Sequence, residues 1–264
     1  MFTSPGSIAF SFGSLSVHWY GIIIGLGIVC CYTYISYEKK RRKLSVDPID
    51  SMAFWLILSG IIGALLYFVL FNPDYFYAFP LEIFAIWKGG LAIHGALIGG
   101  SMAFLIFILR NKLSFLLYAD IIMPGVLLAQ AIGRWGNFFN NEAYGSPTTL
   151  PWKLFIPSQF RRPELINFEY YHPTFLYESL WNLAGFAILL IIAHKLHKKP
   201  EGTVLFSYLI WYSFGRFFIE GLRLDSLYFG QVRAAQFVSV MLFLAGIFGL
   251  IIIYNKNKLG KNRT

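Results

Sequence analysis

Long apolar runs separated by short polar segments form the main pattern along this chain. Each run is close to the roughly 20 helical residues that cross the hydrocarbon core of a bilayer. Asp120 and Pro124 interrupt one of them, at 113–133. The pattern predicts an all-α integral membrane protein, a single membrane-embedded domain over residues 1–264. Its seven transmembrane helices are expected at residues 17–37, 51–72, 90–109, 113–133, 174–194, 203–222 and 234–254.

The longest segment outside the predicted spans is 134–173. It is rich in proline and contains Trp152, Tyr170 and Tyr171. Prolines break helices, whereas aromatic residues favour strands and small apolar cores. We therefore expect a small ordered extracytoplasmic cap with short strands, and not a separate domain.

The composition agrees with a membrane protein. The chain is 57% hydrophobic and only 13% charged, whereas a typical soluble domain carries about 25% charged residues. Its net charge of +9 would suggest a nucleic-acid partner in a soluble protein. Most of the Lys and Arg residues, however, stand in short tracts at the ends of predicted spans, which argues against nucleic acid. These tracts lie at 39–43, 110–112, 195–199 and 256–263.

The basic tracts also predict the orientation. Positively charged loops stay in the cytoplasm, and seven alternating spans place all four tracts on one side. Six or eight spans would place one tract on the wrong side. We therefore expect a multi-pass protein whose N-terminus is outside and whose C-terminus is cytoplasmic.

The segment 133–145, with the sequence GRWGNFFNNEAYG, is the strongest local motif. It places an arginine, three asparagines and a glutamate within nine residues, where the fourth predicted span meets the outer surface. A guanidinium beside amide groups is suited to binding a phosphate. If the helix continues, Arg134 and Asn137 share one face. The structural alternative is an interfacial arginine that reaches water, with asparagines that cap a helix end.

Two further motifs place ionisable residues inside predicted spans. His94 stands in the glycine-rich stretch 89–100, and an ionisable residue at membrane depth is a functional candidate. The alternative is a neutral histidine hydrogen-bonded between helices. In the sixth span, Tyr212, Arg216, Glu220 and Arg223 follow helical spacing and form one polar stripe that must face the interior. There the alternative is a simple Arg216–Glu220 pair.

Two motifs at span ends have mainly structural interpretations. The segment 172–178, HPTFLYE, resembles a helix start, with Tyr177 and Glu178 available for hydrogen bonds between helices. Tyr20, in HWYG, suits either an interfacial aromatic belt or a headgroup contact. The candidate residues map to one depth near the outer face, which indicates one site open to lipid.

Taken together, these motifs resemble the prolipoprotein diacylglyceryl transferase family. The resemblance covers essentially the whole chain. It rests on GRxGNFxNxExxG at 133–145, GGLAIHGALIG around His94, HPTFLYE at 172–178, HWYG at 18–21 and YxxxRxxxE at 212–220. Some members have Gln where this chain has Phe175, which we interpret as a variation in helix packing.

The resemblance implies the reaction and its partners. Family members transfer the diacylglyceryl group of phosphatidylglycerol to the lipobox cysteine of a prolipoprotein signal peptide, forming a thioether and releasing glycerol 1-phosphate. The reaction takes place at the outer leaflet of the bacterial cytoplasmic membrane and needs no cofactor, metal or nucleotide. The essential arginines of the family match Arg134 and Arg216, its essential histidine matches His94, and its important tyrosine matches Tyr212.

The expected roles follow from this chemistry. The arginines stabilise the leaving phosphate, and either His94 or Tyr212 deprotonates the thiol. The substrate-binding candidates are Arg134, Asn137, Asn140, Glu142, Gly145, Tyr20, Glu220 and Arg223. A transporter or channel is the alternative class, but the cytoplasmic halves of the spans are nearly pure Leu, Ile and Phe. Another phospholipid-using transferase or hydrolase is the closer alternative.

Overall fold

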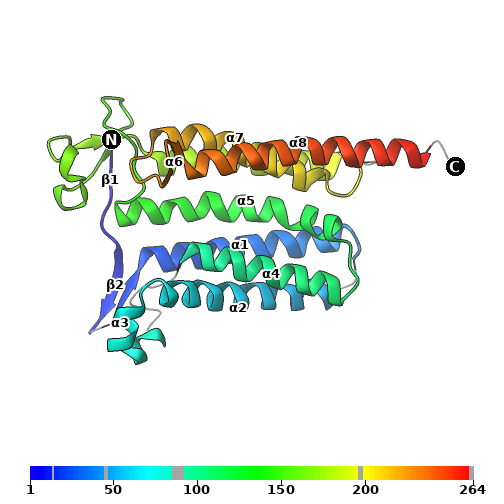
Figure 1. The fold of residues 1–264 in the computed structure, drawn as a ribbon, viewed down its shortest axis with the longest axis horizontal. Helices are drawn as coiled ribbons and strands as arrows, with labels where there is room; N and C mark the ends of the chain where they lie inside the picture. The colour runs from blue at the N-terminus through cyan, green and yellow to red at the C-terminus, as the bar shows by residue number, and fades with distance from the viewer. Residues whose placement is uncertain (14, 45–46, 85–91, 196–198, 262–264) are drawn as a thin grey trace. The chain divides into compact units, whose positions relative to one another are not determined.

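The computed structural model describes the chain except residues 14, 45–46, 85–91, 196–198 and 262–264. Most of the described chain is helical (Figure 1). Its contacts divide it into two compact units. The first contains Met1–Ile35 and Ala119–Thr264, and the second contains Ser36–Tyr118. The single domain expected over residues 1–264 stays a prediction.

The long helices coincide closely with the predicted spans. They are α1 (Trp19–Arg41), α2 (Asp47–Leu70), α4 (Ile93–Arg110), α5 (Phe115–Asn140), α6 (Thr174–Lys195), α7 (Thr203–Leu222) and α8 (Ala234–Lys261). Among the described residues, six of these helices are long and apolar enough to cross a membrane; α7, which carries the polar stripe, is outside that set. An all-α integral membrane protein is thereby confirmed, while the count of seven spans stays a prediction.

Helix α5 explains why a polar residue interrupts the fourth predicted span. Asp120 is buried, and its carboxylate accepts hydrogen bonds from the backbone N–H groups of Gly202 (2.9 Å) and Leu205 (2.8 Å). These donors belong to the start of α7, where the first N–H groups of a helix lack partners within it. Asp120 therefore caps α7 from a neighbouring helix, and α5 continues past Pro124 to Asn140.

Helices α6, α7 and α8 of the first unit lie side by side (Figure 1). Small residues allow α8 to approach α7 closely: a Cβ atom on Gly246 would lie 2.9 Å from the Phe206 carbonyl oxygen. Such close approach of backbones is typical of helix pairs in membranes.

In the second unit, α2 and α4 form a similar close pair. A Cβ atom on Gly95 would collide with the backbone carbonyl of Gly63, and one on Gly99 would collide with that of Ser59. The glycine-rich stretch around His94 therefore serves tight helix packing. Gly89, Gly90 and Leu91 of this motif, and with them the expected start of the third span, lie outside the described residues. The unit also contains α3 (Pro73–Ala78) and the 3₁₀ helix η1 (Pro80–Phe84).

The cap begins later than expected, because α5 is helical through Asn140 and does not end at 133. Residues 141–173 contain β4 (Leu154–Phe155), β5 (Tyr170–Tyr171) and the 3₁₀ helices η3 (Ser158–Phe160) and η4 (Pro163–Leu165). Strand β4 pairs with β5 in antiparallel fashion and with β1 (Phe2–Thr3) in parallel. The expected short strands are therefore present, and the N-terminus completes their sheet.

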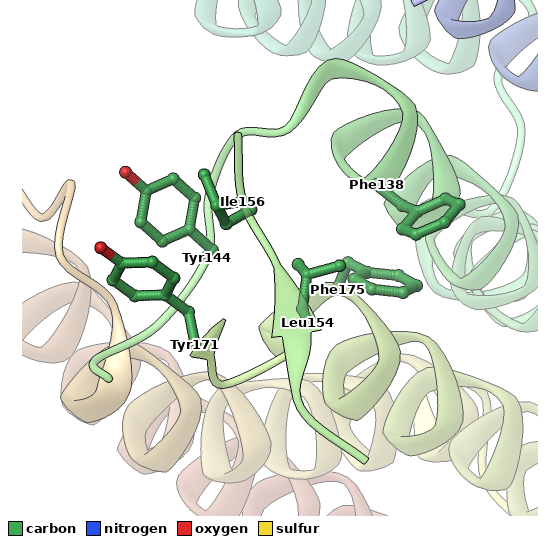
Figure 2. Packing of buried hydrophobic residues seen from close by; sticks show 6 residues of the cluster. All are labelled: Phe138, Tyr144, Leu154, Ile156, Tyr171 and Phe175. Atoms are coloured by element: carbon green, nitrogen blue, oxygen red, sulfur yellow. The ribbon is translucent and has the colours of Figure 1, made fainter. Parts of the chain in front are cut away.

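A small apolar core joins the cap to the helices. It consists of Phe138, Tyr144, Leu154, Ile156, Tyr171 and Phe175 (Figure 2). Phe138 and Phe175 come from α5 and α6, and their ring centroids lie 4.9 Å apart. This contact fits the interpretation of Phe175 as a packing residue. Two further strand pairs lie outside the cap: β2 (Ile8–Phe12) with β3 (Leu15–His18), and β6 (Tyr228–Phe229) with β7 (Val232–Arg233).

Candidate functional site

A buried carboxylate, Glu178, joins three helices of the first unit. It lies in the first turns of α6 with a side chain that is only 3% exposed. Arg134 of α5 places Nη2 3.0 Å from Glu178 Oε1, and Arg216 of α7 donates from Nη1 to Glu178 Oε2 at 3.2 Å. The two arginines expected to bind phosphate are thus brought together by one carboxylate.

Two more contacts extend this cluster along α5 and α7. Arg216 Nη2 lies 2.6 Å from Glu220 Oε2, one turn further along α7. Arg134 Nη1 donates to Asn137 Oδ1 at 3.3 Å, and Asn137 Nδ2 donates to Glu142 Oε1 at 2.8 Å. Arg134 and Asn137 therefore share a helix face, as expected if α5 continues. The Arg216–Glu220 pair forms, but within a larger network and not as an isolated pair.

The ion pairs of this cluster leave hydrogen-bonding capacity unused. Glu178 Oε1 and Glu220 Oε2 lie within ion-pair distance of guanidinium nitrogens, yet neither accepts an aligned hydrogen bond from a described residue. A guanidinium has five N–H donors in a fixed plane. Within this cluster the Arg134–Glu178 and Arg216–Glu220 contacts are thus held by charge without an aligned hydrogen bond.

Aromatic residues surround the arginine cluster. Tyr212 lies one turn before Arg216 on α7, and its ring is parallel to that of Tyr208 with 5.8 Å between centroids. The Tyr208 hydroxyl accepts a hydrogen bond from Gln130 Nε2 at 3.1 Å. Tyr20 lies against α5, since a Cβ atom on Gly136 would be 2.7 Å from Tyr20 Cδ2. Gly136 is therefore required for this close contact.

Gly145 forms a corner where three segments meet. Its N–H donates to the His172 carbonyl oxygen at 3.0 Å, and it bridges to Arg223 at the end of α7. A Cβ atom on Gly145 would be 2.8 Å from His172 Cβ, so no larger residue fits. Burial lowers the pKa of the His172 imidazole, and its Nδ1 is 3.1 Å from the Tyr177 hydroxyl. The neutral ring thus belongs to the supporting structure.

Arg223, the last member of the predicted stripe, has its own partner. Its guanidinium donates to both carboxylate oxygens of Asp225, at 2.9 and 2.7 Å. Burial would raise the pKa of Asp225, but the hydrogen bonds from Arg223 outweigh that effect and lower it. Arg223 is therefore beside the cluster and not within its bonded network.

A reciprocal pair of tryptophans fixes α6 against α7 close to the cluster. Trp181 Nε1 donates to the Trp211 carbonyl oxygen at 2.9 Å, and Trp211 Nε1 donates to that of Trp181 at 3.0 Å. The rings stack with 4.3 Å between centroids. Gly215 and Gly185 provide the room, because a Cβ atom on either would collide with an indole. Since Gly215 precedes Arg216, this tryptophan clasp fixes the backbone that carries the second arginine.

His94 belongs to the second unit. It lies in the first turn of α4 with an exposed side chain, and its ring stacks on Tyr67 with 5.7 Å between centroids. The expected proximity of His94 to Arg134 stays a prediction. Among the described residues, no group of three or more His, Cys, Asp or Glu side chains is arranged to hold a metal ion.

Sequence reasoning missed the central role of Glu178. The segment HPTFLYE indicated a helix start in which Glu178 could hydrogen-bond to another helix, and Arg216 does donate to it; its pairing with both arginines was not predicted. The available signal was charge: two arginines in apolar spans require an acidic partner. Tyr177, by contrast, bonds not to another helix but to two residues outside the helices: His172 and the Trp152 indole N–H, the latter at 2.9 Å.

The fold and the site define an integral membrane protein that carries a buried arginine–glutamate cluster where three helices meet. The family model for prolipoprotein diacylglyceryl transferase matches residues 7–252. A phosphatidylglycerol–prolipoprotein diacylglyceryl transferase from Nostoc sp. is 45% identical over 262 residues, covering 98% of this chain and 93% of the relative. The chain belongs to the prolipoprotein diacylglyceryl transferase family.

Other relatives of the same name are equally similar. The protein from Synechocystis sp. is 46% identical over 257 residues, covering 96% of this chain and 91% of its own length. The protein from Gloeobacter violaceus is 47% identical over 250 residues, covering 94% and 93%. The similarity therefore extends over both units.

Proposed function

We propose that this protein transfers the diacylglyceryl group of phosphatidylglycerol to the lipobox cysteine of a prolipoprotein and releases glycerol 1-phosphate. The names of its relatives supply the two substrates. The observation that carries the proposal is the convergence of Arg134 and Arg216 on Glu178. Two guanidiniums held at one place suit a phosphodiester and the phosphate monoester that leaves.

The reaction balances without a cofactor. The cysteine thiolate attacks C3 of the glyceryl group, a sulfur–carbon bond forms, and the carbon–oxygen bond to the phosphate breaks. The electron pair of that bond goes to the phosphate oxygen, so negative charge grows on the leaving group. Fixed cations aimed at this charge are the expected main catalytic contribution. We assign that role to Arg134 and Arg216, with Glu178 as the residue that positions both.

The remaining polar residues are assigned to the lipid headgroup. Asn137 accepts a hydrogen bond from Arg134 and donates one to Glu142, so Asn137 and Glu142 suit the glycerol hydroxyl groups. Asn140, in the same segment of the chain, is assigned to the headgroup as well. Tyr20, Gly145, Glu220 and Arg223 surround it as further substrate-binding candidates.

Proton removal from the thiol has two candidates. A thiol with a pKa of about 8.5 is mostly protonated at neutral pH, and a general base contributes about 10²–10⁴-fold. We assign His94 as the base, with Tyr212 as the alternative. His94 is exposed on α4 and can meet a substrate, whereas Tyr212 is adjacent to the arginine cluster. A His94→Gln variant with an undiminished rate across neutral pH would exclude His94.

We place the protein in the bacterial cytoplasmic membrane, with the N-terminus outside, the C-terminus cytoplasmic and the site toward the outer leaflet. The basic tracts support this orientation. They lie at the C-terminal end of α1, at the end of α4, after α6 and near the end of α8. Within the first unit, the polar cluster lies at the C-terminal ends of α5 and α7 and at the N-terminal end of α6, and the basic tract after α6 follows the other end of that helix.

The deciding experiment incubates the purified protein with a lipobox peptide and phosphatidylglycerol vesicles. We expect a mass increase of one diacylglyceryl group on the peptide cysteine. Arg134→Ala and Arg216→Ala should each lower the rate by about 10²–10³-fold, the usual effect of removing one electrostatic contact to a transition state. Arg110→Ala is the matched control, because this arginine is exposed at the end of α4. Lipid turnover without peptide modification would instead indicate a phospholipid hydrolase.

A further inference from the structure

A cavity of about 430 Å³ lies on the cap side of the arginine cluster. One wall is the segment 140–144 of the signature motif. The other wall comes from the cap and from the chain after α7, through Phe160, Arg162, Leu224 and Asp225. The volume is in the range of about 300–1,000 Å³ that is usual for pockets that bind small ligands. It can therefore hold a few amino-acid side chains.

Asn141 supplies the strongest sign that the cavity binds something. It lines the cavity, yet the residue is only 5% exposed. Its Oδ1 has no hydrogen-bond partner among the described residues. Buried side-chain oxygens almost always accept a hydrogen bond, and a rotation of this buried amide toward the cavity would present its oxygen to a donor from a ligand. An amide side chain offers both an acceptor and a donor, which matches the two groups of a peptide bond.

The cavity and the arginine cluster share a wall. Glu142 lines the cavity and also accepts the hydrogen bond from Asn137, which itself accepts one from Arg134. A molecule that reaches from Arg134 into the cavity therefore passes over Glu142.

The character of the walls distinguishes a polypeptide from a second lipid. Tyr144, Phe160 and Leu224 provide apolar contacts, while Glu142, Asp225 and Arg162 place charges of both signs around them. Figure 2 shows the Tyr144 ring beside that of Tyr171, and its hydroxyl donates to the Phe160 carbonyl oxygen at 2.6 Å. Acyl chains need a long apolar channel. A mixed wall, with an unpaired amide oxygen of Asn141 buried next to it, suits peptide backbone and small side chains.

We propose that this cavity binds the residues that directly follow the acceptor cysteine of the polypeptide substrate. This inference rests on the proposed function, because it requires a polypeptide acceptor at the arginine cluster. Asn141 accepts a hydrogen bond from a backbone N–H of the substrate, and the aromatic walls contact its side chains. The lipid headgroup contacts Asn137 and reaches only the edge of the cavity, where Asn140 and Glu142 lie.

Photo-crosslinking tests the location. A benzophenone amino acid replaces Phe160 in the full-length protein, and the probe is a lipobox peptide in which Ser replaces the acceptor Cys, so that no product forms. We expect crosslinks to the residues just after this serine. The matched control places the same group at Phe168, which is also an exposed aromatic residue of the cap. Equal crosslinking at both positions, or crosslinks to phosphatidylglycerol at Phe160, would overturn the proposal.

Kinetics provide an independent test. Asn141 has a φ of 52°, a conformation that glycine adopts freely, so Asn141→Gly removes the amide without straining the loop. We expect KM for the peptide to rise about tenfold, roughly the effect of one lost hydrogen bond. KM for phosphatidylglycerol and kcat should change less than about twofold. A rise in KM for the lipid alone would mean a headgroup subsite, and unchanged values would mean an unused cavity. Wild-type transfer to the peptide tests the proposed function separately.

Discussion

Two buried glutamates, Glu38 and Glu178, each hold two arginines, but the chain builds the two clusters in opposite ways. Glu38, near the end of α1, pairs with Arg41 at 2.7 Å and with Arg42 at 2.6 Å, three and four residues further on. Glu178 takes its arginines from two other helices. The first cluster needs only one helix end, whereas the second needs three helices packed together.

This difference is the reason for proposing a functional role for the Glu178 cluster and a structural role for the Glu38 cluster. Around Glu38 the guanidiniums make short, aligned hydrogen bonds from Nε and Nη2, so the carboxylate is well satisfied. Around Glu178 one of the two ion pairs lacks hydrogen-bond alignment. A cluster assembled from separate helices can tolerate such geometry because packing holds it together, and we propose that its two arginines bind a phosphate.

Neutralising each glutamate is the most direct test of this comparison. Among the variants that test the comparison, we expect Glu178→Gln to have the largest effect. Glu178→Gln keeps the size of the side chain but removes the charge that positions Arg134 and Arg216. Transfer should fall about 10²-fold, the lower end of the effect of removing one preorganised electrostatic contact. Glu38→Gln should change transfer less than about threefold. The measurement is the rate of diacylglyceryl addition to a lipobox peptide.

Glu178→Asp is a control that retains the negative charge but has a shorter side chain. It keeps the carboxylate but shortens it by one methylene group, so transfer should recover only in part. If Glu178→Gln and Glu38→Gln lowered the rate equally, the distinction between the two clusters would be wrong. In that case both effects would report the stability of the protein and not the chemistry.

The same contrast explains what the sequence could and could not predict. Spacing along one helix is enough to find the α7 stripe, including the Arg216–Glu220 pair, and the spans follow from apolar length. The pairing of Glu178 with two arginines could not be predicted, because Arg134 and Arg216 are far from it in the sequence. The pairing of β1 with β4 could not be predicted for the same reason, since the sequence of a two-residue strand at the N-terminus does not indicate a parallel partner in the cap.

The tryptophan clasp allows a second test. It examines the packing of α6 against α7, which brings Glu178 and Arg216 together. An added methyl group on Gly215 collides with the Trp181 indole, whereas one on Gly25 of α1 meets no described atom within 4 Å. Overpacking typically costs about 1–3 kcal/mol, so Gly215→Ala should lower the free energy of unfolding by that amount. It should also impair transfer, because Arg216 is the next residue.

Gly25→Ala is the matched control in the same type of helix. Alanine is the better helix former by about 1 kcal/mol, so this variant should be neutral or slightly more stable. Thermal unfolding in detergent compares the two. Equal Tm values for both variants would show that the clasp does not constrain α6 against α7.

The Arg223–Asp225 pair should give the smallest effect, because it is local like the Glu38 cluster and partly exposed. The Asp225 side chain is 45% exposed, so solvent screening reduces the pair to about 0.2–1 kcal/mol. The pKa of Asp225 is lower in the folded protein than in the unfolded chain. Its contribution is therefore complete above the ordinary carboxyl pKa of about 3.9. It disappears as the pH falls through the lower, folded value.

Asp225→Asn should consequently lower Tm slightly at pH 7 and leave it unchanged at a pH below the folded pKa, where the wild-type carboxyl group is also protonated. Thermal unfolding of both proteins at several pH values measures this difference. A Tm difference that persists at low pH would show that Asp225 acts through its shape at the cavity wall and not through its charge. Asp225 would then resemble Glu178, whose role depends on packing between distant segments, even though Arg223 is only two residues from Asp225 in the sequence.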